Sequence, residues 1–294
     1  MKVVQLLLLG LSLGSIYALI ALGFVAIYKG TRVVNLAHGS VMLLSAYVVA
    51  VVSERAGFTT AVLAGLLTAA VAAVAVERIV AMIRTQDHLV PTILTIGVDI
   101  VLAAELSRRI GSRVLSMGDP WGDDRVEFLG TVLPEARIWA TLVCLAVIAG
   151  FFVIFRATDF GTRMRASSED PETAALMGIS QRRVAMAAWA IGGAMACLAG
   201  IFLAAFPNAG LDHTAHVIAL NAIPAIIIGG LDSSEGAVIG GLVVGITQSL
   251  VQGYSEPLAF LGHNAYAVAP YVVMLVVLLV RPAGLLGSKE LTRV

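Results

Sequence analysis

The sequence predicts an all-α, polytopic transmembrane helix bundle with short or broken helices and an inverted internal repeat. Apolar residues make up 59% of the 294 residues, only 13% are charged, and the mean hydropathy is +0.94. A water-soluble chain carries about 25% charged residues, because its surface must stay hydrated. Long apolar runs recur without strand-like alternation, and glycine or proline interrupts several of them. We therefore expect residues 1–294 to form one domain embedded in membrane lipid.

Apolar segments long enough, or nearly long enough, to cross a bilayer recur along the whole chain, since a spanning helix needs about 20 residues. The three weakest are interrupted or short, and we expect them to be re-entrant or broken: 33–52, 214–230 and 236–252. The expected spans are residues 4–28, 33–52, 59–83, 90–106, 138–155, 184–206, 214–230, 236–252 and 265–281.

The distribution of arginines predicts the orientation, because basic residues gather in cytoplasmic loops. The loop 156–183 contains five arginines, so we expect it in the cytoplasm, with the N-terminus outside. The loop 107–137 is expected outside, yet it also contains five arginines, together with five acidic residues. These arginines argue against the orientation. The chain as a whole is expected in the cytoplasmic (inner) membrane.

The segment 35–47, NLAHGSVMLLSAY, places polar residues at the start of an apolar run. Asn35 and His38 are three residues apart, as on one helical face, and Gly39 follows, where the backbone could unwind. Polar groups at membrane depth are costly and usually face protein or a water-filled cavity. Asn35 could equally be the N-cap of a helix. A cap and a substrate pathway are compatible, and the two interpretations have roughly even odds.

The segment 221–246, NAIPAIIIGGLDSSEGAVIGGLVVGI, has the pattern of two half-helices joined by a turn. Pro224 is expected to break or kink its helix, and Gly229 and Gly230 to end it. Short apolar segments interrupted by Gly or Pro in both halves of a chain are the best sequence indication of a substrate path. We therefore assign Asn221, Pro224, Gly229 and Gly230 to that path, with Asn35, His38 and Gly39 from the first half.

The loop 160–180, FGTRMRASSEDPETAALMGIS, predicts a two-turn helix from Pro171 to Met177. Asp170 suits the N-cap, Pro171 the first helical position and Gly178 the C-terminal cap. Its apolar side is expected to be Ala174, Ala175, Leu176 and Met177. A helix this short is marginal alone. Docking into a groove of another protein is favoured about two to one over packing on the chain's own base.

Small residues four apart indicate tight helix packing, since lipid supplies no hydrophobic drive between helices. The GxxxG pairs are Gly10/Gly14, Gly236/Gly240 and Gly241/Gly245. Cys144 and Cys197 lie in separate apolar runs with no CxxC pattern and are expected to be free. The formal charge is zero, so no nucleic-acid partner is expected.

Four stretches together resemble the permease subunits of branched-chain amino acid ABC importers, the high-affinity leucine/isoleucine/valine type. They are LGSIYALIALGFVAIY (13–28), VVNLAHGSVMLLSAY (33–47), RMRASSEDPETAALMGIS (163–180) and AIIIGGLDSSEGAVIGGLVVGI (225–246). RPAGLLG (281–287) is similar to the usual ending in that family.

The resemblance implies a permease domain whose loop 156–183 carries a coupling helix that contacts an ATP-binding subunit. The coupling residues would be Asp170, Pro171, Ala174, Leu176, Met177 and Gly178. The resemblance also implies a periplasmic solute-binding protein and a second, related permease or a homodimer. No cofactor and no catalytic residue is implied.

Two departures from the family pattern bear on the substrate. AMIRTQD (81–87) lacks the Arg-Pro motif that commonly follows the Glu-Arg pair, here Glu77 and Arg78. The span 90–106 also carries Asp99 and Glu105, where neutral residues are more usual. Neighbouring branches of the family carry urea, short amides or other small polar solutes, so these stay possible substrates.

Other function classes are weaker. The three lysines, Lys2, Lys29 and Lys289, lie in no GxxxxGK[ST] pattern, so any ATP must be bound by another subunit. The one GxSxG match, GLSLG (10–14), lies inside a long apolar run rather than at a strand-to-helix turn, and no HExxH pattern occurs, which argues against an enzyme. Asp99 has no basic partner at i±3 or i±4 and could carry a proton in an ion-coupled secondary transporter. We put the odds of such ion coupling at about one in five.

A metal site is the weakest alternative. Asp212, His213 and His216 have the spacing of helical neighbours, but a catalytic metal normally needs three placed ligands and a base. Polar residues at the outer end of a span are favoured about ten to one. Glu105 is expected to pair with Arg108 or Arg109 at i+3 or i+4 and to be structural.

Overall fold

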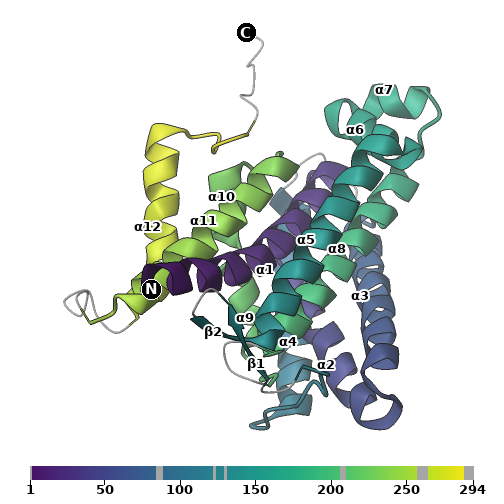
Figure 1. Ribbon diagram of the computed structural model, residues 1–294. Coiled ribbons are helices and arrows are strands. Elements are labelled where there is room, and N and C mark those ends of the chain that lie inside the picture. Colours follow the sequence, from purple (N-terminus) through teal and green to yellow (C-terminus); the bar gives the residue numbers. More distant parts are fainter. Residues whose placement is uncertain are drawn as a thin grey trace.

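The computed structural model describes residues 2–83, 89–121, 124–128, 131–205, 210–256 and 264–287. Its elements are helices and one small antiparallel hairpin (Figure 1). In chain order they are α1 Lys2–Thr31, α2 His38–Ala56, α3 Phe58–Val80, α4 Leu89–Ile110, β1 Arg125–Phe128, β2 Thr131–Pro134, α5 Glu135–Ala157, α6 Asp159–Glu169, α7 Pro171–Leu176, α8 Gln181–Ala205, α9 Ala215–Leu220, α10 Ile223–Gly229, α11 Ser234–Gly253 and α12 Ala265–Val280.

The predicted all-α, multi-pass bundle is confirmed. Among the described residues, seven helices are long and apolar enough to cross a membrane, and the stretches Ala215–Gly229 and Ala265–Val280 are shorter apolar helices. The expected break in 214–230 is present, since these residues form two short helices, α9 and α10, that are separated between Leu220 and Ile223. The same expectation is wrong for 236–252, which lies within the continuous helix α11. The span 33–52 is helical only from His38, where α2 begins.

Helix α1 is the centre of the bundle and is buried from Ser12 to Ile27 almost without interruption. It crosses α11 closely because glycines face the neighbouring backbone. A Cβ on Gly241 or Gly245 would collide with the α1 backbone at Ala18 or Gly14. The predicted GxxxG contacts therefore form the α1–α11 interface, and Gly236 and Gly240 bring α11 equally close to α10.

The helix contacts follow a two-fold pattern that relates α1–α4 to α8–α12. Helix α3 packs on α2 and α8, as α11 packs on α10 and α1. Helix α4 contacts α2 and α3, as α12 contacts α10 and α11. Helices α1 and α8 run in opposite directions, because the Trp189 indole near the start of α8 donates to Thr31 Oγ1 at the end of α1. This arrangement agrees with the expected inverted repeat.

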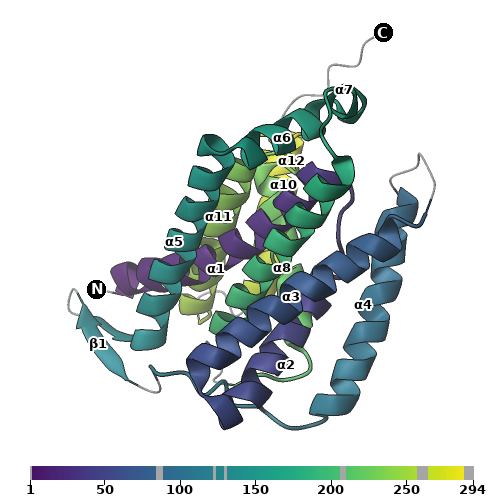
Figure 2. The same cartoon turned by 90° about the vertical axis from the view of Figure 1, so that its right-hand side faces the viewer.

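The two ends of the bundle carry different structures (Figure 2). Helices α6 and α7 project from one end, where Arg32 donates to the Ser168 carbonyl oxygen. The β1–β2 hairpin lies at the opposite end, where Arg125 pairs with Pro134 and Phe128 with Thr131. The sequence did not indicate this hairpin, because its two strands of four residues are too short for a periodicity to register.

Candidate functional site

A short non-helical segment carries the chain from α1 into α2. Arg32 has a φ of 56°, and residues 33–37 are not helical. Asn35 Oδ1 accepts the Ala37 amide at 3.1 Å, and Thr95 Oγ1 of α4 accepts the Leu36 amide at 3.0 Å. Asn35 therefore organises the start of α2 from two residues ahead of the N-cap, which is Ala37. Gly39 does not unwind, because it lies in the first turn of α2.

The side chains of Asn35 and His38 are buried without their full set of hydrogen bonds. His38 is 0% exposed, and its ring centroid lies 4.4 Å from that of Phe24 in α1. Within the described residues, neither the two ring nitrogens of His38 nor the Asn35 Nδ2 atom has a hydrogen-bond partner. Buried polar atoms normally have partners, so these atoms mark a place for water or a polar solute.

The second break in the helices is centred on Asn221, which ends α9. Pro224 lies in the first turn of α10, so it begins that helix rather than kinking a longer one. The α10 helix ends at Gly229, and Gly230 has a φ of 105°, a conformation that favours glycine. The side chain of Ser233 caps the start of α11 by accepting the Gly236 amide at 2.9 Å.

Asn221 lies beside a polar group of the central helix. The Tyr17 hydroxyl of α1 donates to Gln248 Oε1 of α11 at 2.9 Å and is also within hydrogen-bonding reach of Asn221. The sequence analysis did not single out Tyr17 or Gln248. Neither stood out in the sequence, because Tyr17 follows Ser12 and Ser15 in α1, and Gln248 lies between Thr247 and Ser249 in α11.

The two breaks lie on one side of α1 but do not merge into one site. His38 packs on Phe24 and Asn221 lies at Tyr17, and these two residues of α1 are seven apart, about 10 Å along the helix. Between them the first turn of α2 meets α9, where Gly39 packs against the His216 carbonyl oxygen.

Gly229 and Gly230 lie away from the polar groups of the candidate pathway. The Ile228 and Gly229 carbonyl oxygens accept the amides of Leu285 and Leu286 at 2.8 and 3.0 Å. Gly230 approaches the backbone of Gly287 closely. Their role in this structure is to close the α10 hairpin against the segment 281–287, so the structure does not bring them to Asn221 or His38.

The predicted helix in the loop 156–183 is present as α7, with Asp170 as its N-cap. Asp170 Oδ1 accepts the amides of Glu172 and Thr173 at 3.1 and 3.0 Å. These hydrogen bonds, with that from the Thr173 hydroxyl as the largest contribution, hold the pKa of the Asp170 carboxyl below its ordinary value. Gly178 follows the helix with a φ of 83°, as its predicted capping position requires.

The apolar residues of α7 do not share one side, which corrects the expected pattern. Ala174 is buried against the chain's own base, whereas Leu176 is 88% exposed and Met177 79% exposed. The reason is the shortness of the helix, since α7 ends at Leu176 and Met177 continues into the Gly178 turn. Helix α7 is thus anchored by Ala174 and presents two large apolar side chains outward.

The comparisons with known proteins give one family. A family model described as "Branched-chain amino acid transport system / permease component" matches residues 6–280. The chain belongs to this family. The LivH permease protein of Escherichia coli (strain K12), named for high-affinity branched-chain amino acid transport, is 31% identical over 97% of this chain and 96% of its own. BraD of Pseudomonas aeruginosa, similarly named, is 27% identical over 99% and 97%.

A third relative is archaeal. A probable branched-chain amino acid transport permease LivH of Methanocaldococcus jannaschii is 27% identical over 93% of this chain and 89% of its own. The chain is therefore a transport permease component and not an enzyme, and the matches favour the importer over the ion-coupled secondary transporter.

Asp99 of α4 is hydrogen-bonded to the neighbouring helix α2. The Ser40 hydroxyl of α2 contacts both the Asp99 carbonyl oxygen, at 3.1 Å, and its carboxyl oxygen Oδ1. A hydrogen bond to a neighbouring helix was the simpler of the two interpretations of this acid. This hydrogen bond connects α4 to the first turn of α2, just after the non-helical segment 33–37.

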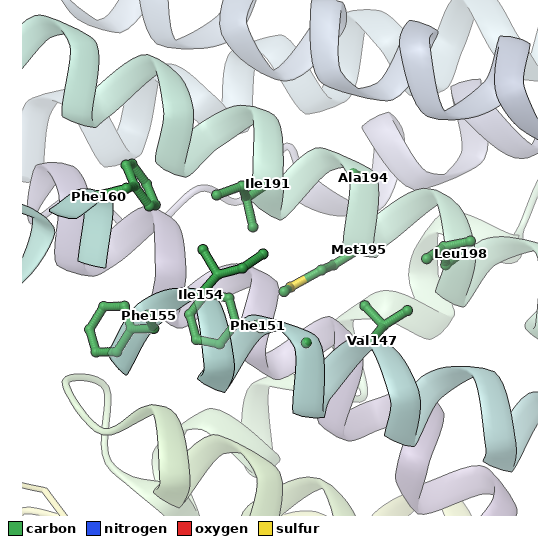
Figure 3. A pocket seen from close by; sticks show the side chains of 10 residues that line it. Val147, Phe151, Ile154, Phe155, Phe160, Ile191, Ala194, Met195 and Leu198 are labelled. Atoms are coloured by element: carbon green, nitrogen blue, oxygen red, sulfur yellow. The ribbon is translucent and has the colours of Figure 1, made fainter. Parts of the chain in front are cut away.

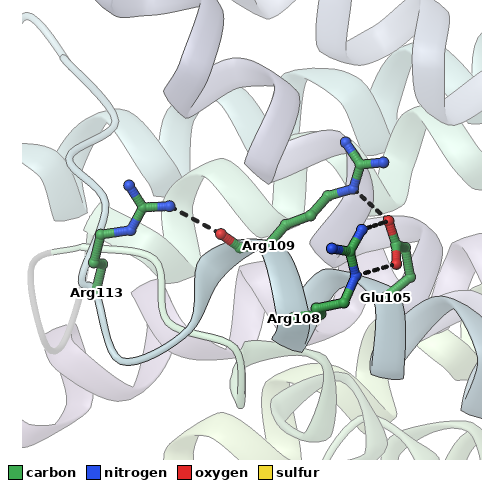
Figure 4. Close-up of polar contacts among 4 residues, drawn as sticks. All are labelled: Glu105, Arg108, Arg109 and Arg113. Carbon is green, nitrogen blue, oxygen red and sulfur yellow. Dashed lines mark hydrogen bonds and ion pairs between the residues drawn. The ribbon is translucent and has the colours of Figure 1, made fainter.

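The charged groups at the far end of α4 pair with one another (Figure 4). Glu105 accepts from Arg108 at 2.8 Å and from Arg109 at 2.7 Å, which confirms the predicted pairing. Arg113 donates to the Arg109 carbonyl oxygen at 2.9 Å. In the part of the chain that the structure describes, Asp212, His213 and His216 do not form a group that could hold a metal ion.

Proposed function

We propose that this permease component is the membrane-spanning subunit of an ATP-driven importer of branched-chain amino acids. The family and the full-length relatives named for that transport support this substrate class. The import would be driven by ATP hydrolysis in separate subunits, since this sequence contains no phosphate-binding loop.

The observation that carries the proposal is the projecting helix α7. A two-turn helix whose two largest apolar side chains are almost fully exposed gains little from its own chain. Docking of Leu176 and Met177 into a groove of the ATP-binding subunit would bury them. The end of the bundle that carries α6 and α7 would then face the cytoplasm.

The assembly would include further partners. Delivery of the solute requires a periplasmic solute-binding protein at the hairpin end of the bundle. A second permease, either a related chain or another copy of this one, would complete the pathway in the cytoplasmic (inner) membrane. The arginines of the loop 156–183 support this orientation.

The pathway would pass the two breaks at His38 and Asn221. A branched-chain amino acid has a zwitterionic end and an apolar side chain, so its path needs a few hydrogen-bonding groups in an apolar lining. Asn35, His38 and Asn221 provide such groups next to α1. Because they are few, they would make weak, transient contacts, and the binding protein would set specificity.

The test is uptake of labelled leucine by cells that express the complete transporter. Replacing Leu176 or Met177 by Asp should abolish uptake and ATPase co-purification, since a charge in an apolar groove loses its hydration. Leu176→Met preserves apolar character and should keep both. Wild-type uptake by Leu176→Asp at normal membrane levels would contradict the role of α7.

A further inference from the structure

A groove runs between α5 and α8 near the end of the bundle that carries α6 (Figure 3). Its volume is about 240 Å³, and every lining residue is apolar or glycine. Ile154 on its wall is 48% exposed, so the groove opens sideways from the bundle. The principal lining side chains are Phe151, Phe155 and Phe160 with Ile191, Met195 and Leu198.

The length of the groove matches one leaflet of a bilayer. Its wall on α5 extends from Val147 to Phe155, eight residues or about 12 Å of helix. The hydrocarbon core of a bilayer is about 30 Å thick, so one leaflet contributes about 15 Å. Since α5 ends at Ala157, the groove spans from the α6 end of the bundle to about the bilayer centre.

Basic side chains gather where the groove ends. Lys29 Nζ lies 5.0 Å from the centroid of the Phe155 ring, and Arg165 Cζ lies 5.2 Å from it. Arg165 also donates to the Phe155 carbonyl oxygen. The same aromatic ring therefore lines the groove and contacts two cations.

The acidic groups near this end do not cancel its positive charge. Glu235 pairs with Arg156 at 2.9 Å, and Glu235 and Asp232 both act electrostatically on Lys29. Arg32 and Arg165 act on Lys29 as well. Asp159, the first residue of α6 and the neighbour of Phe160, adds a third acid. Four basic groups thus outnumber three acids, so the end of the groove attracts an anion. The basic groups are Lys29, Arg32, Arg156 and Arg165.

We propose that this groove binds one acyl chain of an anionic phospholipid of the cytoplasmic leaflet, with the lipid phosphate at Lys29 and Arg165. An apolar slot of one-leaflet length that ends in cations has the shape and charge of such a lipid. Basic pockets between transmembrane helices on the cytoplasmic side are suited to anionic head groups. A second copy of the chain fits less well, because a stable protein interface takes about 20–30 residues from each partner, whereas ten residues line this groove.

The bound lipid would also brace the coupling region. Phe160 belongs to the first turn of α6, and α6 leads directly into α7. An acyl chain that fills the space beside Phe160 would hold α6 against α5 and α8. The lipid would therefore support the position of α7 without contacting it.

Native mass spectrometry of the purified chain with added phosphatidylglycerol or phosphatidylcholine tests the site. We expect one phosphatidylglycerol to be retained at concentrations where phosphatidylcholine is lost. Gly150→Leu should abolish this retention, because Gly150 lines the groove and a Cβ there meets open space. The matched control is Gly97→Leu, which also projects into open space, on α4, and should retain the lipid.

A second pair of variants tests the charge. Lys29→Gln should weaken phosphatidylglycerol retention about fivefold, the effect of one basic residue near an anionic lipid. Lys2→Gln removes the lysine at the opposite end of the same helix, where Lys2 lies 5.1 Å from the centroid of the Tyr254 ring. It should leave retention unchanged.

Three results would overturn the proposal. They are equal retention of the two lipids, lipid retention by Gly150→Leu equal to wild type, and a groove occupied by a second copy, seen as a dimer that Gly150→Leu dissociates. If Gly150→Leu fails to fold, Ala194→Leu fills the groove from the α8 wall and decides the same question.

Discussion

Single buried polar side chains are the most informative residues of this permease. An unpartnered polar atom in an apolar interior costs about 1–3 kcal/mol. Asn35 and His38 carry such atoms at 1% and 0% exposure, in the middle of a bundle whose other interior groups are largely apolar. Stability alone would favour an apolar residue at position 38, so a role in moving solute or water accounts for the histidine better than packing does.

Replacing His38 or Asn221 by Leu should slow uptake while leaving assembly with the ATPase subunits intact. The thermal stability of His38→Leu should equal or exceed that of wild type, since Leu removes the unpartnered nitrogens. Initial rates of leucine, isoleucine and valine uptake give the first measurement, and thermal unfolding of the purified chain gives the second. His213→Leu, on the exposed outer segment, is the control and should transport normally.

A change in which solute is carried would refute the weak-contact pathway and place a specific binding site in the membrane. Unchanged uptake by both His38→Leu and Asn221→Leu would show instead that these residues only organise helix ends.

The Asp170 cap predicts a pH dependence at the start of α7. Hydrogen bonds lower the pKa of this carboxyl in the folded protein, so the cap contributes fully above the unfolded value of about 3.9. The contribution is lost as the pH falls through the lower folded value. The amides of residues 172–177 should therefore show the same protection factors against hydrogen exchange at pH 7 and pH 5.

Two variants separate the cap from its charge. Asp170→Ala should speed exchange in residues 172–177 several-fold relative to wild type at both pH 7 and pH 5, because two amides lose their acceptor. Asp170→Asn keeps an acceptor and should remain protected without any pH dependence. A smaller protection factor for wild type at pH 5 than at pH 7 would contradict a lowered pKa.

Whole helices depend on small residues where their backbones cross. Gly245 faces Gly14 of α1, and any Cβ there collides with backbone, which cannot move aside as a side chain can. Gly245→Leu should therefore destabilise the bundle by more than the roughly 1–3 kcal/mol typical of overpacking. Membrane yield and thermal unfolding measure this effect. Gly97→Leu is the control, and equal stability of the two variants would show that the α1–α11 contact is loose.

The sequence predicted the long helices and their glycine contacts well, because hydropathy over about 20 residues and GxxxG spacing are local signals. The Asp170 cap and the Gly178 turn were predicted for the same reason. The break at residues 33–37 was placed too late, at Gly39, because the Thr95 hydroxyl that satisfies the Leu36 amide comes from another helix.

Contacts between distant segments explain the other misses. Tyr17, Phe24 and Gln248 reach the candidate pathway only because α1 crosses the whole bundle, and no short motif records that crossing. The burial of Ala174 likewise depends on where the base of the bundle lies. Conversely, Gly229 and Gly230 have the pattern of a substrate path, but the segment 281–287 packs on them.

At the scale of the whole molecule, the contacts among the described residues have the pattern of an inverted repeat, and helix α5 lies outside this pattern. Contacts relate α1–α4 to α8–α12, while α5 has no counterpart and bears α6 and α7 at its end. The groove proposed for lipid lies along this unpaired helix, between α5 and α8. Coupling to ATP hydrolysis would thus act on the part of the bundle that lies outside the two-fold pattern, whereas the two breaks lie within it.

The orientation of the whole bundle can be tested with single cysteines and a membrane-impermeant maleimide. Thr162→Cys lies on exposed α6 and should be labelled only from the cytoplasm, while Val132→Cys lies on the exposed hairpin and should be labelled only from outside. The physical reason is the arginine-rich loop 156–183, which is costly to translocate. The unaltered chain is the control: its free cysteines, Cys144 and Cys197, are buried at 0% exposure and should not react. Labelling of both variants from the same side would contradict this topology. Reversed labelling would place α7 outside the cell, where no ATP-binding subunit could reach it.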